Sequence, residues 1–246
     1  ARRAAELSSL FADPQVRAIF FARGGYGTAR VIPLLDVNPA KADPKIVVGY
    51  SDLTVLHAYL HHHCKWTSFY GPTLVKHLGD HAPATNWEWC LKAIASLRPL
   101  GALPATTCTV IKPGKASGVL LGGCLMLVHC GLKTIYEWDT SGGILFLEDA
   151  GEKLYAIDRM LTHLKHAGAF RGVKGLLFGS LVLHPDEPAK DQLIPMLTDF
   201  FHDFPGPVLA GFPAGHGDPF ITLPFGARAT LTTDPPGITI DEAAVT

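Results

Sequence analysis

The stretch IVVGYSDLT, residues 46–54, decides the fold class and also raises the main question about function. Three β-branched residues, 46–48, lead to a glycine, and the residues from Asp52 onward have helical spacing. The leucines on the expected helix face are Leu53, Leu56 and Leu60. This order predicts a buried strand, a tight turn at 49–51 and a helix, which is the repeating unit of α/β proteins.

Ser51 stands at the turn, and two roles compete for it. Serine is among the preferred N-cap residues of helices. Taken alone, the nine residues favour the cap, because GYSDL lacks the second glycine of the G-x-S-x-G nucleophile motif. As a nucleophile, Ser51 would project from the C-terminal edge of the sheet, where α/β proteins bind ligands. The backbone N–H of Asp52 would then help to hold an oxyanion at the helix N-terminus.

Outward from this stretch, short apolar runs alternate with segments of helical period. Strands are predicted at 16–22, 46–48, 143–147, 173–178 and 208–210, together with two β-segments joined by a turn at Pro113-Gly114. Helices are predicted at 4–11, from residue 52, at 86–97, and at 153–166, where Gly168 ends the last one. The alternation predicts an α/β fold.

The stretch 99–104, PLGALP, has the proline and glycine content of a linker. We therefore predict an N-terminal domain over 1–97, a linker over 98–106 and a C-terminal domain over 107–246. The chain opens with ARRAAEL, without a methionine and within an expected helix. We expect a preceding N-terminal portion, and with it any targeting segment, to be missing from this sequence.

Composition narrows the functional classes. The 246 residues are 48 % hydrophobic and 17 % charged, which is typical of a protein with a sizeable core. A formal net charge of −1 supplies no field that would attract nucleic acid or an anionic membrane. No apolar run reaches the roughly 20 residues needed to span a bilayer. The five cysteines form no CxxC pair, which favours reduced core thiols in a cytosolic-type compartment.

Three further motifs are ambiguous when taken singly. RGGYG, 23–27, could bring backbone N–H groups close to a carbonyl oxygen or a phosphate, but a plain tight turn needs the same residues. FLED, 146–149, ends an apolar strand with two carboxylates, which either pair with a histidine or cap the next helix. GHGDP, 215–219, places His216 between glycines, where it is either solvated or able to reach into a cleft.

The histidine run HHHC, 61–64, does not predict a metal site. Consecutive residues on a helix point in different directions, so three neighbouring histidines cannot easily converge on one ion. Cys124 and Cys130 are expected to be core residues, since neither has an activating neighbour in sequence. We therefore expect no metal.

Together and in this order, the motifs resemble the LD-carboxypeptidase family of serine peptidases, which includes the microcin-immunity hydrolases. The resemblance runs from the first helix almost to the C-terminus. The segments that carry it are ARGGYGTARVIPLLD (22–36), GYSDLTVLHAYL (49–60), GVLLGGCLMLV (118–128), LFLEDAGEKLYAIDRMLTHL (145–164) and PAGHGDPFITLPFGARATL (213–231). The combination of GYSD, FLED and GHG is far more specific than any one of them.

The resemblance implies a Ser–His–Glu triad in a cleft between the two domains. Ser51 would be the nucleophile, His216 the general base and Glu148, not Asp149, the carboxylate that orients the imidazole. The oxyanion hole would use the backbone N–H of Asp52 and that of Gly25 or Gly24. It also implies an N-terminal Rossmann-like parallel-sheet domain, here without its first strand–helix unit, and a C-terminal α/β domain of mixed β-segments.

The same resemblance implies a substrate and a setting. The typical substrate is a murein tetrapeptide, cut between the L-centre of a diamino acid and the terminal D-alanine through an acyl-enzyme. No cofactor is expected, and the partner is a small peptide rather than nucleic acid or membrane. Recycling of murein takes place in the cytoplasm. The resemblance does not determine the oligomeric state, for which a homodimer is the candidate.

One departure from the family pattern concerns residues 122–126. Family members commonly carry GGN with a following serine, whereas this chain has Gly122-Gly123-Cys124 and Met126. We assign no role to Cys124, and the departure puts substrate contacts near it in question.

Two alternative functions stay open at this point. A microcin-immunity-type hydrolase would cut peptidyl nucleotides and offer an aromatic side chain for base stacking. The tryptophans available for that are Trp66, Trp87, Trp89 and Trp138. A non-catalytic binding module would use RGGYG as a ligand loop and Ser51 only as a cap.

Overall fold

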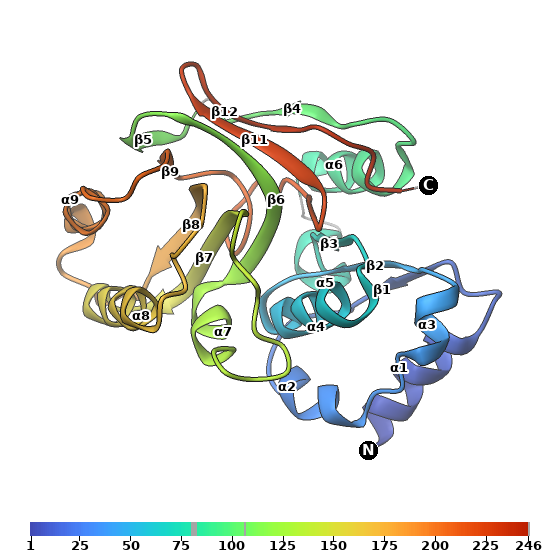
Figure 1. The fold of residues 1–246 in the computed structure, drawn as a ribbon. Coiled ribbons are helices and arrows are strands. Elements are labelled where there is room, and N and C mark those ends of the chain that lie inside the picture. Colours follow the sequence, from blue (N-terminus) through green and yellow to red (C-terminus); the bar gives the residue numbers. More distant parts are fainter. Residues whose placement is uncertain (80–82, 106, 246) are drawn as a thin grey trace.

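The strands lie in two sheets in the computed structural model, which describes residues 1–79, 83–105 and 107–245 (Figure 1). The smaller sheet has the order β1-β2-β3-β10 and the larger the order β4-β12-β11-β6-β7-β8-β9-β5. The strands are β1 (Ala18–Phe20), β2 (Ile46–Gly49), β3 (Ser68–Tyr70), β4 (Gly101–Leu103), β5 (Thr109–Lys112), β6 (Lys115–Cys124), β7 (Ile144–Glu152), β8 (Gly175–Leu183), β9 (Val208–Ala210), β10 (Leu223–Phe225), β11 (Arg228–Thr233) and β12 (Pro236–Ile240).

Helices precede, connect and flank these strands. They are α1 (Arg2–Ala12), α2 (Thr28–Val31), α3 (Asn38–Ala42), α4 (Thr54–Cys64), α5 (Leu74–His77), α6 (Ala84–Ala95), α7 (Leu125–Cys130), α8 (Leu154–Ala167) and α9 (Leu193–Phe200), with short 3₁₀ helices at Ile32–Leu34, Ser51–Leu53 and Lys190–Gln192. The predicted α/β fold is confirmed. In the described part of the chain, no helix combines the length and apolar character that a bilayer crossing demands.

The smaller sheet has a parallel core. β1, β2 and β3 run parallel, as expected for strands that are connected through helices. β10 adds to β3 in the antiparallel direction, although it comes from the C-terminal part of the chain. The predicted C-terminal domain therefore contributes one strand to the sheet of the N-terminal part, and the two halves are interlocked.

The larger sheet is mixed. β6, β7, β8 and β9 form a parallel centre, and the outer strands β5, β11, β12 and β4 join it in antiparallel pairs. β4 lies inside the predicted linker, 98–106, so part of that stretch belongs to the larger sheet. Its three residues pair with β12 along one side only, at the sheet edge. A short edge strand tolerates flanking prolines, because only one side needs backbone donors. Residue 106, the end of the predicted linker, lies outside the described residues.

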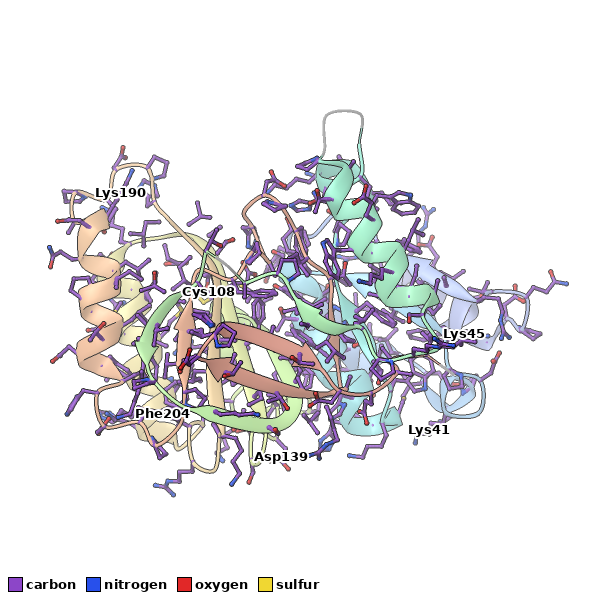
Figure 2. All side chains as sticks on the ribbon, turned by 90° about the horizontal axis from the view of Figure 1, so that it is seen from above. Lys41, Lys45, Cys108, Asp139, Lys190 and Phe204 are labelled. Carbon is purple, nitrogen blue, oxygen red and sulfur yellow. The ribbon has the colours of Figure 1, made fainter. Side chains whose placement is uncertain are left out.

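Helix α8 lies within one residue of its predicted span, 153–166. Its buried side chains are Ile157, Met160, Leu161 and Leu164, and Gly168 ends it in the left-handed region at φ 82°. Helices α8 and α9 lie on the outer side of the larger sheet in both views. In Figure 2, Lys190 before α9 and Lys45 before β2 mark opposite sides of the molecule. Between these sides, α4 contacts β6 and α7.

The corner after β2 is held by a buried histidine. His57 of α4 is fully buried, and its Nε2 lies 2.8 Å from the carbonyl oxygen of Gly49. Its Nδ1 lies 2.8 Å from the hydroxyl of Ser68 on β3. Since a carbonyl only accepts, Nε2 carries the hydrogen and Nδ1 accepts from Ser68. His57 thus ties α4 to the two strands that flank the turn of Ser51.

We expect His57 to make the fold sensitive to acid. Burial lowers its pKa to about 4, although the hydrogen bond to Gly49 opposes this effect. In the unfolded chain it takes up a proton near pH 6.5, so the folded state loses stability as the pH falls from about 6.5 towards 4, by up to roughly 3 kcal/mol. His57→Gln should flatten this dependence when the free energy of unfolding is measured with urea at about pH 7 and about pH 4.5. The exposed His166→Gln is the control, and an unchanged slope in His57→Gln would contradict the argument.

Candidate active site

Ser51 occupies a strained position on the turn after β2. Its φ angle of 60° lies in the left-handed region, which costs a residue with a side chain about 1–2 kcal/mol. Neither the 3₁₀ helix at Ser51–Leu53 nor α4 has a side-chain cap, so the cap interpretation of Ser51 is wrong. Its Oγ instead lies 3.1 Å from Nε2 of His216. A strained turn that exposes a hydroxyl to a histidine is the geometry of a nucleophile elbow.

His216 bridges Ser51 and Glu148. Its Nδ1 lies 2.7 Å from Oε2 of Glu148, and its backbone N–H donates to the same oxygen at 3.0 Å. The loop before it is pressed against this carboxylate, and a side chain on Gly215 would overlap Glu148. Because an ionised carboxylate only accepts, Nδ1 carries the hydrogen and Nε2 is free to accept the serine proton. The tautomer is therefore the one that general-base chemistry requires.

Glu148 is buried on β7 and has its charge satisfied by donors. Its side chain is 0 % exposed, against 18 % for His216. Oε2 accepts the two hydrogen bonds from His216, and Oε1 accepts one of 2.6 Å from the hydroxyl of Tyr70. These donors offset the cost of burying a charged carboxylate.

The neighbouring carboxylate, Asp149, serves a different purpose. It accepts the backbone N–H groups of Met126 and Ala150, both at 2.8 Å, at the start of α7 and along its own strand. Burial raises its pKa to about 6. Within the described residues it makes no hydrogen bond to His216. The geometry thus shows that the two adjacent carboxylates have different hydrogen-bond partners, a distinction that the local sequence pattern does not make.

The glycine-rich loop lies against the serine. A Cβ placed on Gly24 would lie 3.0 Å from Cβ of Ser51 and 3.3 Å from its Oγ. Asp52 anchors the end of this loop, because its Oδ2 accepts the N–H of Thr28 at 2.9 Å and the hydroxyl of Thr28 at 2.7 Å. Among described residues, the N–H groups of Gly24, Gly25 and Asp52 donate to no protein acceptor. These predicted oxyanion donors are therefore unpaired.

Substituting Gly24 by alanine is expected to disturb this approach. The added methyl group would push the loop away from Ser51, and the displaced N–H would stabilise an oxyanion less well. We expect kcat to fall roughly tenfold to hundredfold, because one oxyanion-hole donor is typically worth that much or more. Gly237→Ala is a matched control, since its Cβ would meet only one atom, at 4.0 Å. Steady-state kinetics that show equal kcat for both variants would contradict the role of Gly24.

Several side chains near the site were not predicted from the sequence. Tyr70 ends the three-residue strand β3, and Tyr50 precedes the serine with its ring centroid 4.9 Å from that of His216. Lys76 donates to the backbone oxygen of His216 at 3.2 Å. His77 is buried and packs edge-to-face on Tyr50. The residues around GYSD and FYGP are apolar and show no periodicity from which these contacts could have been predicted.

The cysteines and the histidine run stay apart from this chemistry. All five cysteines are described, and no two of them form a disulfide. Cys124 is buried, as expected of a core residue, and its backbone N–H donates to the hydroxyl of Thr54. Cys130 is exposed at the end of α7, so the core prediction is wrong for that residue. The histidine run ends α4, where Nε2 of His63 contacts the carbonyl of Ile135. Over 1–79, 83–105 and 107–245 no cluster of three or more His, Cys, Asp or Glu side chains is arranged to hold a metal ion.

Both halves of the chain match models of one protein family. Residues 1–71 match the LD-carboxypeptidase N-terminal domain, and residues 117–231 match the LD-carboxypeptidase C-terminal domain. The chain belongs to the LD-carboxypeptidase family. The family resemblance seen in the sequence is thereby confirmed.

Three LD-carboxypeptidase-like relatives illustrate the similarity. A probable murein peptide carboxypeptidase of Bacillus subtilis is 36 % identical, over 94 % of this chain and 73 % of the relative. The crystal structure of muramoyltetrapeptide carboxypeptidase from Oxalobacter formigenes is 29 % identical with a TM-score of 0.87, covering 99 % of this chain and 85 % of that one. Microcin C7 self immunity protein MccF in complex with aspartyl sulfamoyl adenosine is 25 % identical with a TM-score of 0.90, covering 99 % and 81 %.

The family assignment does not by itself locate a substrate cleft. Cavities of about 520, 340 and 240 Å³ lie elsewhere in the molecule, and none is lined by Ser51, Glu148 or His216. The largest of these lies beside Trp138, before the start of β7, whereas Glu148 lies further along that strand. A cleft between the two halves at Ser51 stays a prediction.

Proposed function

We propose that this chain is a serine-type LD-carboxypeptidase with Ser51, His216 and Glu148 as its catalytic triad. The observation that carries the proposal is the continuous contact from Ser51 Oγ to His216 Nε2, at 3.1 Å, and from His216 Nδ1 to Glu148, at 2.7 Å. The reaction is hydrolysis of the bond between the L-centre of a diamino acid and the terminal D-alanine of a murein tetrapeptide. Names of relatives such as the murein peptide carboxypeptidase support this substrate class.

In the proposed mechanism, Ser51 Oγ attacks the scissile carbonyl carbon while Nε2 of His216 takes the hydroxyl proton. Glu148 stabilises the resulting imidazolium through its Nδ1–H contact. The backbone N–H of Asp52 and that of Gly24 or Gly25 hold the oxyanion. His216 then gives its proton to the leaving amine, D-alanine departs, and a water molecule activated by His216 hydrolyses the acyl-enzyme.

A second candidate within the same chemistry is hydrolysis of peptidyl or aminoacyl nucleotides. It is favoured by the similarity to MccF, whose structure was determined with aspartyl sulfamoyl adenosine. Such a ligand would need an accessible aromatic ring for its base. Trp66 and Trp138 are buried and Trp89 is partly buried, whereas Trp87 and Tyr26 of the glycine-rich loop are exposed, so these last two are the best stacking candidates.

One experiment separates these substrates. The purified protein is incubated with murein tetrapeptide and, separately, with an aminoacyl nucleotide, and the products are weighed by mass spectrometry. Release of D-alanine from the tetrapeptide by wild type but not by Ser51→Ala supports the carboxypeptidase. Cleavage of the nucleotide substrate alone would replace it with the second candidate.

A non-catalytic binding module is the alternative from another class. It predicts that Ser51 is no more reactive than an ordinary serine, and the hydrogen bond that the hydroxyl of Ser51 donates to Nε2 of His216 argues against this. An active-site-directed fluorophosphonate tests this directly. Labelling of folded wild type that disappears in Ser51→Ala supports the enzyme, whereas unlabelled folded wild type supports the binding module.

The proposal includes the setting of the reaction. We place it in the cytoplasm, where murein fragments are recycled, and the five unpaired cysteine thiols fit a reducing compartment. We also propose a homodimer, to be checked by the molar mass in solution.

A further inference from the structure

The hydroxyl of Tyr70 lies between the two ends of the proposed triad. It donates to Oε1 of Glu148 at 2.6 Å, and its oxygen accepts the backbone N–H of Ser51 at 3.2 Å. Tyr70 is 0 % exposed and ends β3, which pairs with β2 on one side and β10 on the other. One phenol therefore contacts both the carboxylate and the residue that carries the nucleophile, which are 97 residues apart in the chain.

The direction of both hydrogen bonds follows from the charge state of the phenol. Burial, together with the charge of Glu148, raises the pKa of Tyr70 well above its ordinary value, so the hydroxyl stays protonated. Its single hydrogen goes to the carboxylate, which cannot donate when ionised. A lone pair on the oxygen is then left for the N–H of Ser51.

The contact with Glu148 determines how the carboxylate is turned. Oε2 is occupied by the Nδ1–H and backbone N–H of His216, and Oε1 by Tyr70. With both oxygens held, the carboxylate plane cannot rotate away from the imidazole. Without the phenol, Oε1 would be a buried acceptor that lacks its partner, and this favours reorientation.

The contact with Ser51 bears on the strained turn. The left-handed conformation at φ 60° is unfavourable for serine and persists only when its surroundings hold it. The hydrogen bond from the Ser51 N–H to Tyr70 is one such restraint, and it aims Oγ at His216. Tyr70 thus couples the orientation of the nucleophile to that of the carboxylate.

We infer that Tyr70 is a positioning residue of the reaction, acting through Glu148 and the backbone of Ser51, and not only a core aromatic. The inference rests on the proposed function. The alternative is that its ring alone matters, since it stacks on Phe225 at 5.0 Å and packs edge-on against Phe146 at 5.6 Å. Tyr70→Phe keeps the ring and removes only the hydroxyl, so it separates the two explanations.

The test measures the rate at which a fluorophosphonate labels Ser51, because this rate depends on nucleophile activation and not on the identity of the substrate. Tyr70→Phe is expected to slow labelling roughly tenfold to hundredfold. Tyr59→Phe, which removes a hydroxyl on α4, is the matched control and should label at the wild-type rate. In the Glu148→Gln background, Tyr70→Phe should cost a smaller factor than in wild type, since only its contact with the backbone of Ser51 is then left to lose.

The pH dependence of labelling gives a readout that ring packing would not move. The titratable and charged groups around His216 are Glu148, Lys76, His77, Asp218, Tyr50 and Tyr70. Tyr70→Phe leaves all but the last in place. Without the hydrogen bond from Tyr70, more of the negative charge of Glu148 lies on Oε2. This favours the imidazolium form of His216, so the acid limb of the plot of labelling rate against pH moves to higher pH. 3-Fluorotyrosine at position 70 is a stronger hydrogen-bond donor of nearly the same shape, so it should move the acid limb to lower pH. This variant also keeps the test valid if Tyr70→Phe folds poorly.

Each result decides the inference. Slower labelling, coupling to Glu148 and a shifted acid limb support it. The inference is overturned if Tyr70→Phe labels at the wild-type rate, or if it slows labelling by the same factor in wild type and in Glu148→Gln. In either case, labelling of the wild type leaves the proposed function standing. Folded wild type that does not label at all overturns both.

Discussion

Ser51→Ala is expected to lower kcat on the tetrapeptide by a factor of about 10⁴ to 10⁶ with little change in KM. The proposed mechanism joins the hydroxyl oxygen of Ser51 covalently to the acyl group. No other hydroxyl in the described structure is hydrogen-bonded to His216. Alanine removes the nucleophile, whereas the donors of the oxyanion hole remain. A small residual rate above that of water is therefore expected.

The measurement is D-alanine release under steady-state conditions, with circular dichroism as evidence that the variant is folded. Ser117→Ala is the matched control, because Ser117 lies on β6 and its hydroxyl pairs with that of Thr230 on the exposed side. It should keep the wild-type kcat. A folded Ser51→Ala enzyme that retains more than about a tenth of wild-type kcat would exclude Ser51 as the nucleophile.

Glu148→Gln is expected to lower kcat by a factor of roughly 10³ to 10⁴, with the substrate still bound. In wild type, one oxygen of Glu148 accepts from Tyr70 and the other accepts from His216. Glutamine has only one acceptor oxygen, so it cannot accept on both sides. If the amide NH₂ faces His216, Nδ1 must give up its hydrogen and Nε2 then carries it. In that tautomer Nε2 cannot accept the proton of Ser51.

Asp149→Asn provides the comparison for this variant. Asp149 is adjacent in sequence and also buried, but it accepts backbone N–H groups and does not contact His216. We expect its kcat to stay within about threefold of wild type, with the effect confined to stability, which thermal unfolding measures. If Asp149→Asn lost activity as Glu148→Gln did, the assignment of the carboxylate would be wrong.

The secondary structure that local patterns predict agrees well with the structure where the segments are long. The helix of residues 154–167 follows from the spacing of its leucines and from Gly168, because periodicity and the C-terminal glycine act within a few turns. The strand expected at 16–22 is shorter than predicted, Ala18–Phe20, since apolar character continues beyond the residues that pair with β2.

Segments whose structure depends on a distant partner were missed or misassigned. β4 is three residues within a proline-bearing stretch, and its pairing strand β12 lies more than 130 residues later in the chain. β3 and β10 are equally short and pair with each other across the two halves. Three residues carry too little periodicity to predict a strand, and nothing local indicates which edge they will join.

The sequence by itself determined the α/β class, the family and the set of residues proposed for the chemistry, because these depend on local patterns and on motifs kept in order. The residues alone could not separate a helix cap from a nucleophile, or Glu148 from Asp149, and the family resemblance favoured Ser51 and Glu148. Only the tertiary structure places the hydroxyl of Ser51 and the carboxylate of Glu148 against His216. It also places Tyr70 in contact with both Ser51 and Glu148, from the strand β3, which is too short to be predicted from its sequence. Hydrogen bonds between side chains form across space, and their direction depends on packing that adjacent residues do not encode.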